Sequence, residues 1–500
     1  RGLALDAILR YLDSMANALF LGIDMGSQGV RLVAAGEDGA AVSWASVPVQ
    51  SLATAPGTHE QDPAAWWPAV CRASRMLLDD LKSKGYGPEA LAAAAVDGTS
   101  GTLVALDAAG RAVRPALMYN DGRSGTEAKA INALPEAAAL CAKLGYRFAS
   151  SFALAKIVWL LGQEPESFDR TARLAHQADV VVGHLTGDFA VTDYSNALKT
   201  GYDLVERRWP AWFARWPGVL ERLPRVTAPG TVIGQVTREA AAETGLPAGL
   251  PVAAGASDGT AGFLASGASQ PGDYNTTLGT TLVFKGISTA LCGHPDGLIY
   301  CHKLPGGRWL PGGASNTGGE WIARDFAGED LQALDAAAAG LLPTPVLAYP
   351  NLREGERFPF FSPEARGFSV PEPTDRIARF AANLQGTALV ERLGYDRLDG
   401  IAGASGGTVY STGGGSRSDV WSQLRADATG RVLHRPACPE SAFGSAVLAA
   451  AEHFGGVSQA IAALVRIEAS FAPDLTKTAR YDEIYGWFCE ELRRRGYLSA

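Results

Sequence analysis

Two segments half a chain apart share one pattern, and this repeat constrains the fold more than any other feature. Residues 19–24 form an apolar run, residues 25–29 read Met-Gly-Ser-Gln-Gly, and residues 30–35 are again mostly apolar. Residues 273–286 repeat this order, with Leu-Gly-Thr-Thr at the bend. Apolar runs on either side of a glycine-containing bend are typical of an antiparallel hairpin. Repetition at this separation predicts two related domains that face each other.

The residues between the two hairpins favour an α/β chain. Residues 41–49 alternate as a third strand, and residues 92–96 predict a further buried strand. Asp62-Pro63 is typical of a helix start, because Asp caps the helix and Pro fits its first turn. Apolar side chains at residues 481–492 recur at helical spacing and predict a C-terminal helix.

Chain length also fits two domains, because 500 residues exceed what one hydrophobic core usually organises. We predict an N-terminal domain over residues 18–268 and a C-terminal domain over residues 269–500. At that junction the sequence Gly-Ala-Ser-Gln-Pro-Gly interrupts the pattern. Residues 1–17 carry no signal-peptide pattern and are expected to be an extension outside the fold.

Composition narrows the partners. The formal net charge is −8 and no basic block occurs, so nucleic acid is not expected as a partner. No apolar run reaches membrane-spanning length, so no membrane is expected either. Six cysteines form no Cys-x-x-Cys pair, which predicts free thiols and a cytoplasmic location. The oligomeric state stays open, with a homodimer as one option.

The two bends carry residues suited to binding phosphate. Gly26 and Ser27 at the first bend, and Gly279 and Thr280 at the second, are expected to aim N–H groups and a hydroxyl outward. Either bend alone is more often a plain hairpin turn. As a pair from facing domains, they are suited to hold a triphosphate. Asp24 precedes the first bend, and a carboxylate beside phosphate needs Mg²⁺ between them, so we expect Asp24 on the metal or sugar side.

Asp258 is the candidate general base. It follows a short apolar strand and starts a helix rich in small residues, within residues 251–265. An Asp there is commonly an N-cap. A carboxylate held at the end of an inner strand is also suited to accept the proton of a sugar hydroxyl that attacks phosphorus. Both interpretations stay open, because a carboxylate has two oxygens.

A glycine-rich segment follows a third predicted strand. Residues 413–415 are three consecutive glycines, and Trp421 lies two turns into the next helix. Bare backbone allows a flat ring to lie on it, and the tryptophan is suited to pack on a nucleobase. The alternative is a crowded turn with a core tryptophan, because large aromatic residues usually serve packing.

Together, these segments resemble the FGGY carbohydrate kinases over nearly the whole chain. The matching segments are residues 21–31, 59–67, 97–102, 255–258, 278–281 and 413–421. The resemblance implies an α/β fold with two actin-like (ribonuclease H-like) ATPase domains. Each domain is expected to hold a mixed five-stranded sheet flanked by helices. The active site is expected in the cleft between them, with ATP, Mg²⁺ and a sugar.

The resemblance also implies residue roles. Asp258 is the implied catalytic base, and Asp24 and Asp258 lie on the Mg²⁺ side. The implied ATP-binding residues are Gly26, Ser27, Gly279, Thr280, Gly318, Gly414, Gly415, Ser418 and Trp421.

Within the family, the chain resembles the D-ribulose kinases of cyanobacteria and plants. Asp97-Gly-Thr-Ser100 stands where many xylulose kinases carry Gln-Met-His-Gly. The resemblance implies transfer to D-ribulose, giving D-ribulose 5-phosphate, with D-xylulose or another pentulose or polyol as the alternative. Asp97 and Asp121 are equally suited to organise turns at strand ends. The implied sugar contacts are Asp24, Asp97, Ser100, Asn120, Asp121 and Asp258.

Two functions from other classes compete with a kinase. Ser257 and Ser405 both lie in Gly-x-Ser-x-Gly, the pattern of a hydrolase nucleophile elbow. A hydrolase leaves both bends unexplained, and no His-Gly-Gly-Gly segment is present. A sugar-independent actin-like ATPase is the other alternative. No Gly-x-x-x-x-Gly-Lys-Ser/Thr segment occurs, so a P-loop is excluded as the phosphate site.

Overall fold

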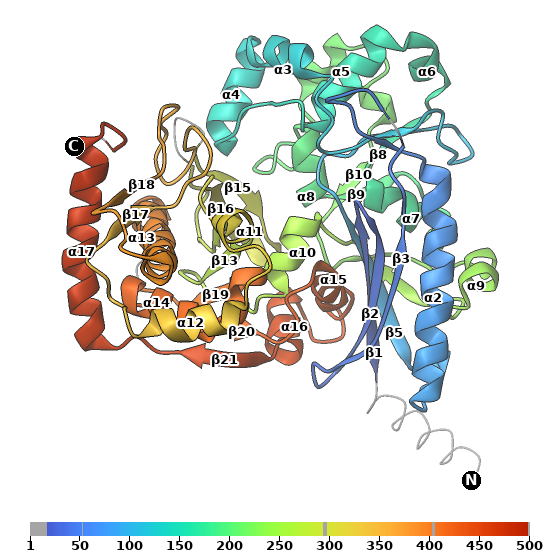
Figure 1. Ribbon diagram of the computed structural model, residues 1–500. Coiled ribbons are helices and arrows are strands. Elements are labelled where there is room, and N and C mark those ends of the chain that lie inside the picture. The colour runs from blue at the N-terminus through green and yellow to red at the C-terminus, as the bar shows by residue number, and fades with distance from the viewer. Residues whose placement is uncertain (1–17, 53, 294–297, 403–405, 499–500) are drawn as a thin grey trace.

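The computed structural model describes residues 18–52, 54–293, 298–402 and 406–498. They form two α/β lobes that lie side by side, each with a mixed sheet and flanking helices (Figure 1). The predicted extension at residues 1–17 lies outside the described residues.

The N-terminal lobe contains a six-stranded sheet with the order β11-β12-β5-β1-β2-β3. β1 to β3 form the predicted antiparallel meander, β5 and β12 run parallel to β1, and β11 pairs antiparallel to β12. Alternate residues of β1 pack on opposite faces, against α2 and α7 on one side and α10 and α15 on the other. The bounds are β1 Leu19–Gly26, β2 Gly29–Gly36, β3 Ala41–Pro48, β5 Leu91–Gly98, β11 Val232–Gln235, β12 Pro251–Ala253, α2 Trp66–Ser83, α7 Gln177–Thr186, α10 Asp258–Leu264 and α15 Ser441–Ala449.

The C-terminal lobe contains a seven-stranded sheet with the order β15-β16-β14-β13-β19-β20-β21. Its central strands repeat the N-terminal pattern, because β13, β14 and β16 form a meander and β19 and β20 run parallel to β13. Aromatic and aliphatic side chains of α13, α14 and α17 fill its core. The bounds are β13 Tyr274–Leu278, β14 Leu282–Gly286, β15 Tyr300–Lys303, β16 Trp309–Ala314, β19 Val409–Thr412, β20 Leu433–Pro436, β21 Ile467–Phe471, α13 Arg376–Ala402, α14 Asp419–Thr429 and α17 Leu475–Arg494.

The two-lobed fold is confirmed, and the count of five strands per sheet is wrong. A shared five-strand core lies in both sheets, and antiparallel edge strands extend it: β11 in the first, β15 and β21 in the second. β11 and β21 have no fully buried residue, so their hydrophobic alternation is too weak to mark them in the sequence.

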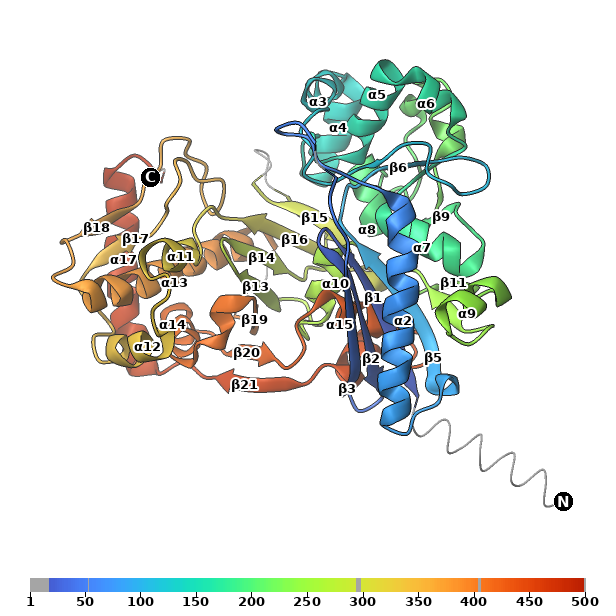
Figure 2. The same ribbon diagram turned by 45° about the vertical axis from the view of Figure 1, so that its right-hand side comes forward.

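A helical region with its own aromatic core stands above the N-terminal sheet in Figure 2. Its elements lie between β5 and β11 along the chain. They are β6 Val104–Leu106, β7 Ala116–Leu117, α3 Gly125–Asn132, α4 Pro135–Leu144, α5 Ala153–Gln163, α6 Pro165–Arg170, β8 Arg173–Ala175, β9 Val191–Asp193, α8 Tyr194–Ala197 and β10 Arg225–Thr227. The remaining elements are β4 Glu60–Gln61, α9 Arg238–Thr244, α11 Glu320–Asp325, α12 Leu331–Ala339, β17 Leu347–Tyr349, β18 Phe368–Val370 and α16 Val457–Leu464.

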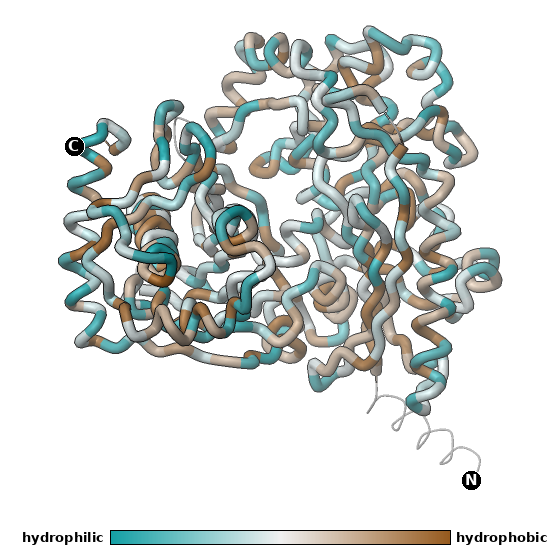
Figure 3. The backbone as a smooth tube through the Cα atoms, in the orientation of Figure 1, coloured by the Kyte–Doolittle hydropathy of each residue, from teal (hydrophilic) through white to brown (hydrophobic). Residues whose placement is uncertain are grey.

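Local sequence signals account for both ends of the fold. Asp62 accepts a hydrogen bond from the Ala64 N–H, and a short 3₁₀ turn then leads into α2, as predicted. The predicted C-terminal helix is confirmed as α17, whose hydrophobic and hydrophilic segments alternate in Figure 3. All six cysteines are free. Within the described ranges, no helix is long and apolar enough to cross a membrane.

Candidate active site

A cavity of about 650 Å³ opens between the two lobes. The N-terminal lobe contributes β1, β2 and the start of α10, and the C-terminal lobe contributes the inner ends of β13, β14 and β19. Predicted residues from both lobes therefore meet at one place. The lining residues that matter below are Asp24, Arg31, Asp258, Thr277, Lys285, Thr412 and Gly414.

Asp24 and Asp97 form a carboxylate pair on neighbouring parallel strands, β1 and β5, where they lie in register. The Arg31 guanidinium contacts Asp24 Oδ2 at 3.2 Å, and the Ser445 hydroxyl donates to Asp97 Oδ2 at 2.6 Å. Asp97 is completely buried. Burial and the neighbouring charge of Asp24 raise its pKa well above the ordinary range. The pair is therefore poised for a cation or a sugar hydroxyl.

Asp258 lies beside this pair, at the first position of α10. Ser257 occupies the N-cap position, so the carboxylate of Asp258 does not cap the helix through the bond expected of an N-cap. One oxygen accepts the N–H of Gly259 at 2.6 Å. Burial raises the pKa of Asp258 to about 6, and the charge of Asp24 adds to the shift. A carboxyl with that pKa is suited to accept a proton near neutral pH.

Two lysines face Asp258, and the sequence patterns did not mark them. The ammonium of Lys285, on β14, donates to the carbonyl of Gly259 and so reaches the opposite lobe. Gly312 lies in register with it on β16, and the missing side chain leaves room for Lys285 to lie across that strand. Burial lowers the pKa of Lys285 and of Lys199 to about 8, although the charge of Asp258 opposes the shift.

Buried polar groups without partners gather around these residues. They come from the end of β5, the start of α7, α8 and β15, so both lobes contribute. Buried polar groups are normally hydrogen-bonded, and a cluster of unpaired ones fits a ligand rich in hydroxyls. Only Asp97 and Ser100 among them were expected from the sequence. Of the twelve unpaired buried atoms in the described residues, the five in these segments are Asp97 Oδ1, Ser100 Oγ, Gln177 Nε2, Asn196 Oδ1 and His302 Nδ1, and none of their residues lines the 650 Å³ cavity.

Both predicted bends are present as tight turns. Ser27 and Gln28 connect β1 to β2, and Gly26 lies beside the Asp24–Arg31 pair. At the second turn, a Cβ on Gly279 would meet no atom closer than 4.0 Å, so this side is open. Gly318 packs behind this turn, where a Cβ would lie 2.5 Å from the carbonyl of Thr280.

Position 318 therefore requires glycine. The buried carboxylate of Glu356 fixes the loop that contains Gly318. The Ser315 hydroxyl and the Asn316 N–H donate to this carboxylate at 2.8 and 2.6 Å.

The glycine-rich segment only partly matches its predicted role. Gly414 lines the cavity with open space around it, as a nucleotide platform requires. Ser418 caps α14, accepting the Trp421 N–H at 2.9 Å. Trp421 is 1% exposed and its indole N–H donates to the carbonyl of Leu384, so the prediction that it packs on a base is wrong. Gly415 faces that ring instead of the cavity, since a Cβ there would lie 3.0 Å from it.

Of the predicted sugar contacts, Asp24 and Asp258 line the cavity, and Asp97, Ser100, Asn120 and Asp121 do not. Asp121 is fully buried and its two oxygens accept from the Arg123 guanidinium, the Arg123 N–H and the His59 N–H. All its acceptor sites are used, so it organises the turn, as its alternative interpretation had it. Asn120 is exposed on that turn and does not line the cavity.

The hydrolase alternative is excluded by the surroundings of Ser257. Its side chain is 2% exposed and meets the hydroxyls of Thr260 and Ser195 at 3.0 and 3.5 Å. A nucleophile elbow needs an exposed serine beside a histidine base. Ser405, the other candidate, lies outside the described residues.

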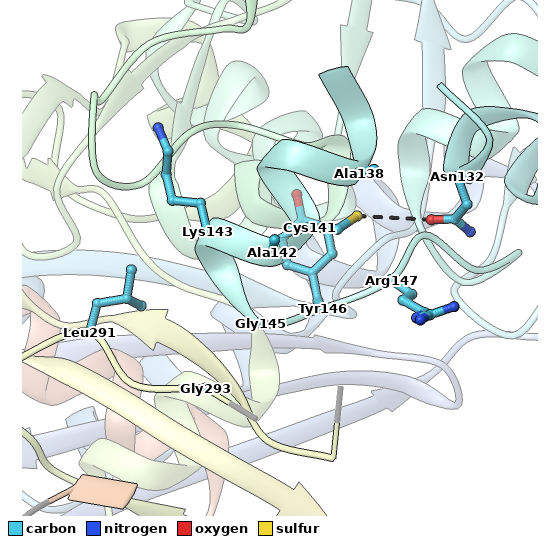
Figure 4. A pocket seen from close by; sticks show the side chains of 10 residues that line it. All are labelled: Asn132, Ala138, Cys141, Ala142, Lys143, Gly145, Tyr146, Arg147, Leu291 and Gly293. Carbon is cyan, nitrogen blue, oxygen red and sulfur yellow. Dashed lines mark hydrogen bonds between the residues drawn. The ribbon is translucent and has the colours of Figure 1, made fainter. Parts of the chain in front are cut away.

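A second cavity, of about 620 Å³, contains none of the predicted site residues. Figure 4 shows it between α4 and the connection from β14 to β15, with Cys141 directed at Asn132. The lobes touch here, because a Cβ on Gly145 would lie 3.2 Å from the Cα of Gly293.

Two mixed sheets with a shared strand order, which enclose a carboxylate cluster and a glycine platform, define an ATP-dependent carbohydrate kinase. Two family models match the two parts of the chain separately. The N-terminal domain of the FGGY family of carbohydrate kinases matches residues 19–265, and its C-terminal domain matches residues 275–453. The chain belongs to the FGGY family of carbohydrate kinases.

Individual relatives agree on the class. A xylulose kinase of Escherichia coli (strain K12) is 29% identical over 439 residues, covering 83% of this chain and 86% of its own. The solved structure of a xylulose kinase from Rhodospirillum rubrum has a TM-score of 0.83 at 29% identity, covering 95% of this chain and 98% of its own. A Plasmodium falciparum glycerol kinase with ADP shares the fold, with a TM-score of 0.82 at 18% identity and coverage of 97% and 99%.

Proposed function

We propose that this chain transfers the γ-phosphoryl group of ATP to the terminal O5 hydroxyl of a 2-ketopentose. The observation that carries the proposal is Asp258, with its raised pKa, beside Asp24 and Lys285 in the cavity, together with unpaired buried polar atoms in the neighbouring segments. A ketopentose offers four hydroxyls and one carbonyl, which match these donors and acceptors in kind. Asp258 accepts the O5 proton, and Lys285 stabilises negative charge as the phosphoryl group passes between the lobes.

D-xylulose is the first candidate and D-ribulose the second. Relatives named xylulose kinases support the first. The segment Asp97-Gly-Thr-Ser100, which differs from the expected xylulose kinase segment, supports the second. The two sugars differ only in the configuration at C3. Ser100 and Asp97, with their unpaired oxygens, are the residues that we propose to discriminate at this carbon.

The carboxylates fit a Mg²⁺ ion shared with phosphate. In the part of the chain that the structure describes, no group of three His, Cys, Asp or Glu forms a closed metal site. Mg²⁺ commonly uses one or two carboxylates together with phosphate oxygens, so Asp24 and Asp258 suffice as protein ligands. Bound there, the ion would supply charge neutralisation, and Arg31 would keep Asp24 in place.

A steady-state panel tests the proposal. ADP release is measured at saturating ATP with D-xylulose, D-ribulose, L-ribulose, ribitol and glycerol, and without sugar. We expect one ketopentose to have at least tenfold higher kcat/KM than ribitol and glycerol. ADP release that is equal with and without sugar would refute the proposal and favour the sugar-independent ATPase.

A further inference from the structure

A third cavity, of about 840 Å³, lies between the lobes and away from the proposed reaction. Residues 228–232 line it from the N-terminal lobe and residues 303–307 from the end of β15. Residues 451–452 and 455–459 line it from the segment that leads into α16. It shares no lining residue with the catalytic cavity. α15 lies between the two cavities, because Ser441 at its start lines the catalytic cavity and Ala451, just past its end, lines this one.

Hydrogen-bond donors converge on this cavity. Tyr194 is 6% exposed and lines the cavity, and its hydroxyl makes no hydrogen bond to another residue that the structure describes. Arg207 and Lys303 line it as well, and no carboxylate lies within ion-pair distance of either in the described ranges. Burial lowers the pKa of Lys303, and the charge of Arg207 adds to the effect, which indicates that the two cations lie near each other.

The start of α16 adds backbone donors. Gly456 is its N-cap and provides no side-chain hydrogen bond, so the N–H groups of the first turn are uncapped. Val457, Ser458 and Gln459, the residues of that turn, line the cavity. The N-terminus of an eight-residue helix attracts anions through its free N–H groups and its dipole.

We propose that this cavity is a regulatory site that binds the phosphate group of a small phosphorylated sugar. Two cations, the hydroxyl of Tyr194 and a helix N-terminus line one cavity and would all donate to an anion bound there. The volume exceeds what phosphate alone needs and lies in the range of small-molecule sites, about 300–1,000 Å³. Glu452 is the one acidic side chain among the lining residues, and it opposes the anion.

Two elements connect this site to the catalytic cavity. α8 carries Tyr194 toward the proposed site and the unpaired Asn196 toward the sugar cluster. β15 carries Lys303 toward the proposed site, and the preceding residue, His302, carries another unpaired atom of that cluster. A ligand that holds Tyr194 and Lys303 together would fix the position of one lobe against the other. We therefore expect binding to change the KM for the sugar more than kcat.

Calorimetric titration of the full chain tests the site, with D-ribose 5-phosphate as the probe. ADP and the preferred ketopentose are present at saturation to fill the catalytic cavity. We expect one bound probe per chain and none with unphosphorylated D-ribose. The double variant Arg207→Met/Lys303→Met should weaken binding at least tenfold, and Glu452→Gln should strengthen it about threefold, the effect of removing one opposing charge. Lys129→Met, on the exposed face of α3, is the matched control and should bind as the wild type does.

Three outcomes would overturn the proposal: no binding by the wild type, binding that the double variant leaves unchanged, or equal affinity for inorganic phosphate, which excludes a role for the sugar. If the double variant does not fold, the single variants and the opposite effect of Glu452→Gln still decide the question. The probe should also change the KM for the ketopentose at least twofold in the wild type and not in Arg207→Met. The binding measurement does not depend on which sugar the enzyme phosphorylates. A failure of the proposed regulatory site can therefore be told apart from a failure of the proposed reaction.

Discussion

Equivalent strand positions in the two lobes carry side chains of different charge: two carboxylates in the N-terminal lobe and two neutral hydroxyls in the C-terminal lobe. In the N-terminal lobe, Asp24 on β1 lies in register with Asp97 on β5. At the equivalent positions of the C-terminal lobe, Thr277 on β13 lies in register with Thr412 on β19, and their hydroxyls are 2.9 Å apart. Each pair stands at the inner end of its sheet, just before the hairpin bend.

The difference shows how one scaffold serves two ligands. Paired carboxylates repel anions and favour a metal ion or sugar hydroxyls. The side of the catalytic cavity formed by the N-terminal lobe, here called the N-terminal wall, is therefore suited to bind the sugar. Neutral hydroxyls beside a glycine platform can bind an anion without charge repulsion. The side formed by the C-terminal lobe, here called the C-terminal wall, is therefore suited to bind the nucleotide. Lys285 extends from the C-terminal wall to Gly259 on the other side and adds the positive charge between the walls.

The largest expected effect comes from removing the proposed base. Asp258→Asn keeps the shape of the side chain and the bond from Gly259 but cannot accept a proton. We expect kcat to fall by about 10²–10⁴-fold with little change in the KM for the sugar. Single-turnover phosphoryl transfer measures this, and Ser257→Ala, one residue away, should retain most activity. Near-normal turnover of Asp258→Asn at saturating sugar would show that the acidic wall binds and does not catalyse.

Lys285 tests whether the two walls act together. Lys285→Met should lower kcat about 10–100-fold, the cost of one charged hydrogen bond, about 1.5–3 kcal/mol. In the wild type, kcat/KM should fall below pH 6 as Asp258 gains its proton and above pH 8 as Lys285 loses its own. Lys285→Met should abolish the alkaline limb and keep the acidic one. Lys285→Arg, which stays charged, should restore most of the rate but not the alkaline limb.

If the alkaline limb of the pH profile is unchanged in Lys285→Met, it belongs to another group. Lys199 is one such group, because burial also lowers its pKa to about 8. The pH profile therefore separates a role in charge stabilisation from a purely structural bond to Gly259.

Thr277→Asp makes the nucleotide wall resemble the sugar wall. A carboxylate introduced there should repel the phosphates and raise the KM for ATP about tenfold, close to 1.4 kcal/mol. The KM for the sugar should change less than twofold, because the change lies on the opposite wall. Thr277→Ser, which keeps the hydroxyl, is the control. An equal rise in both KM values would mean that the walls do not divide the ligands.

Local patterns predicted the parts of this site that lie on one segment. The hairpin bends and the start of α10 each follow from spacing within about a dozen residues, so Asp24 and Asp258 could be placed from the sequence. Lys285 and His302 could not. They come from strands of the other lobe, and only the packing of the lobes brings Lys285 to Asp258 and His302 to Lys199.

The wrong predictions have a common physical cause, since a motif position does not reveal which way a side chain faces. Trp421 lies in the expected helix yet points into the core beside Trp321. Asp121 lies on the expected turn, but Arg123, two residues on, takes both of its oxygens. Short-range pairing of this kind is visible in the sequence as an Asp-x-Arg spacing and favours the structural interpretation.

The smallest expected effect concerns how far the N-terminal wall depends on the C-terminal part of the chain. Ser445, on α15, donates to Asp97 although 348 residues separate them. Ser445→Ala should lower the free energy of unfolding by about 1–3 kcal/mol, because it leaves a buried acceptor unpaired. The lost bond also favoured the charged carboxylate, so the pKa of Asp97 should rise further.

Denaturant unfolding measures the first effect, and the sugar KM against pH reports the second. Ser445→Thr, which keeps the hydroxyl, is the control. If Ser445→Ala changes stability but leaves the sugar KM unchanged, α15 only holds the acidic pair in place. If the KM rises with pH in the variant, α15 also controls the charge of the wall that binds the sugar, and the C-terminal part of the chain then acts on the site at Asp97 as well as at Lys285.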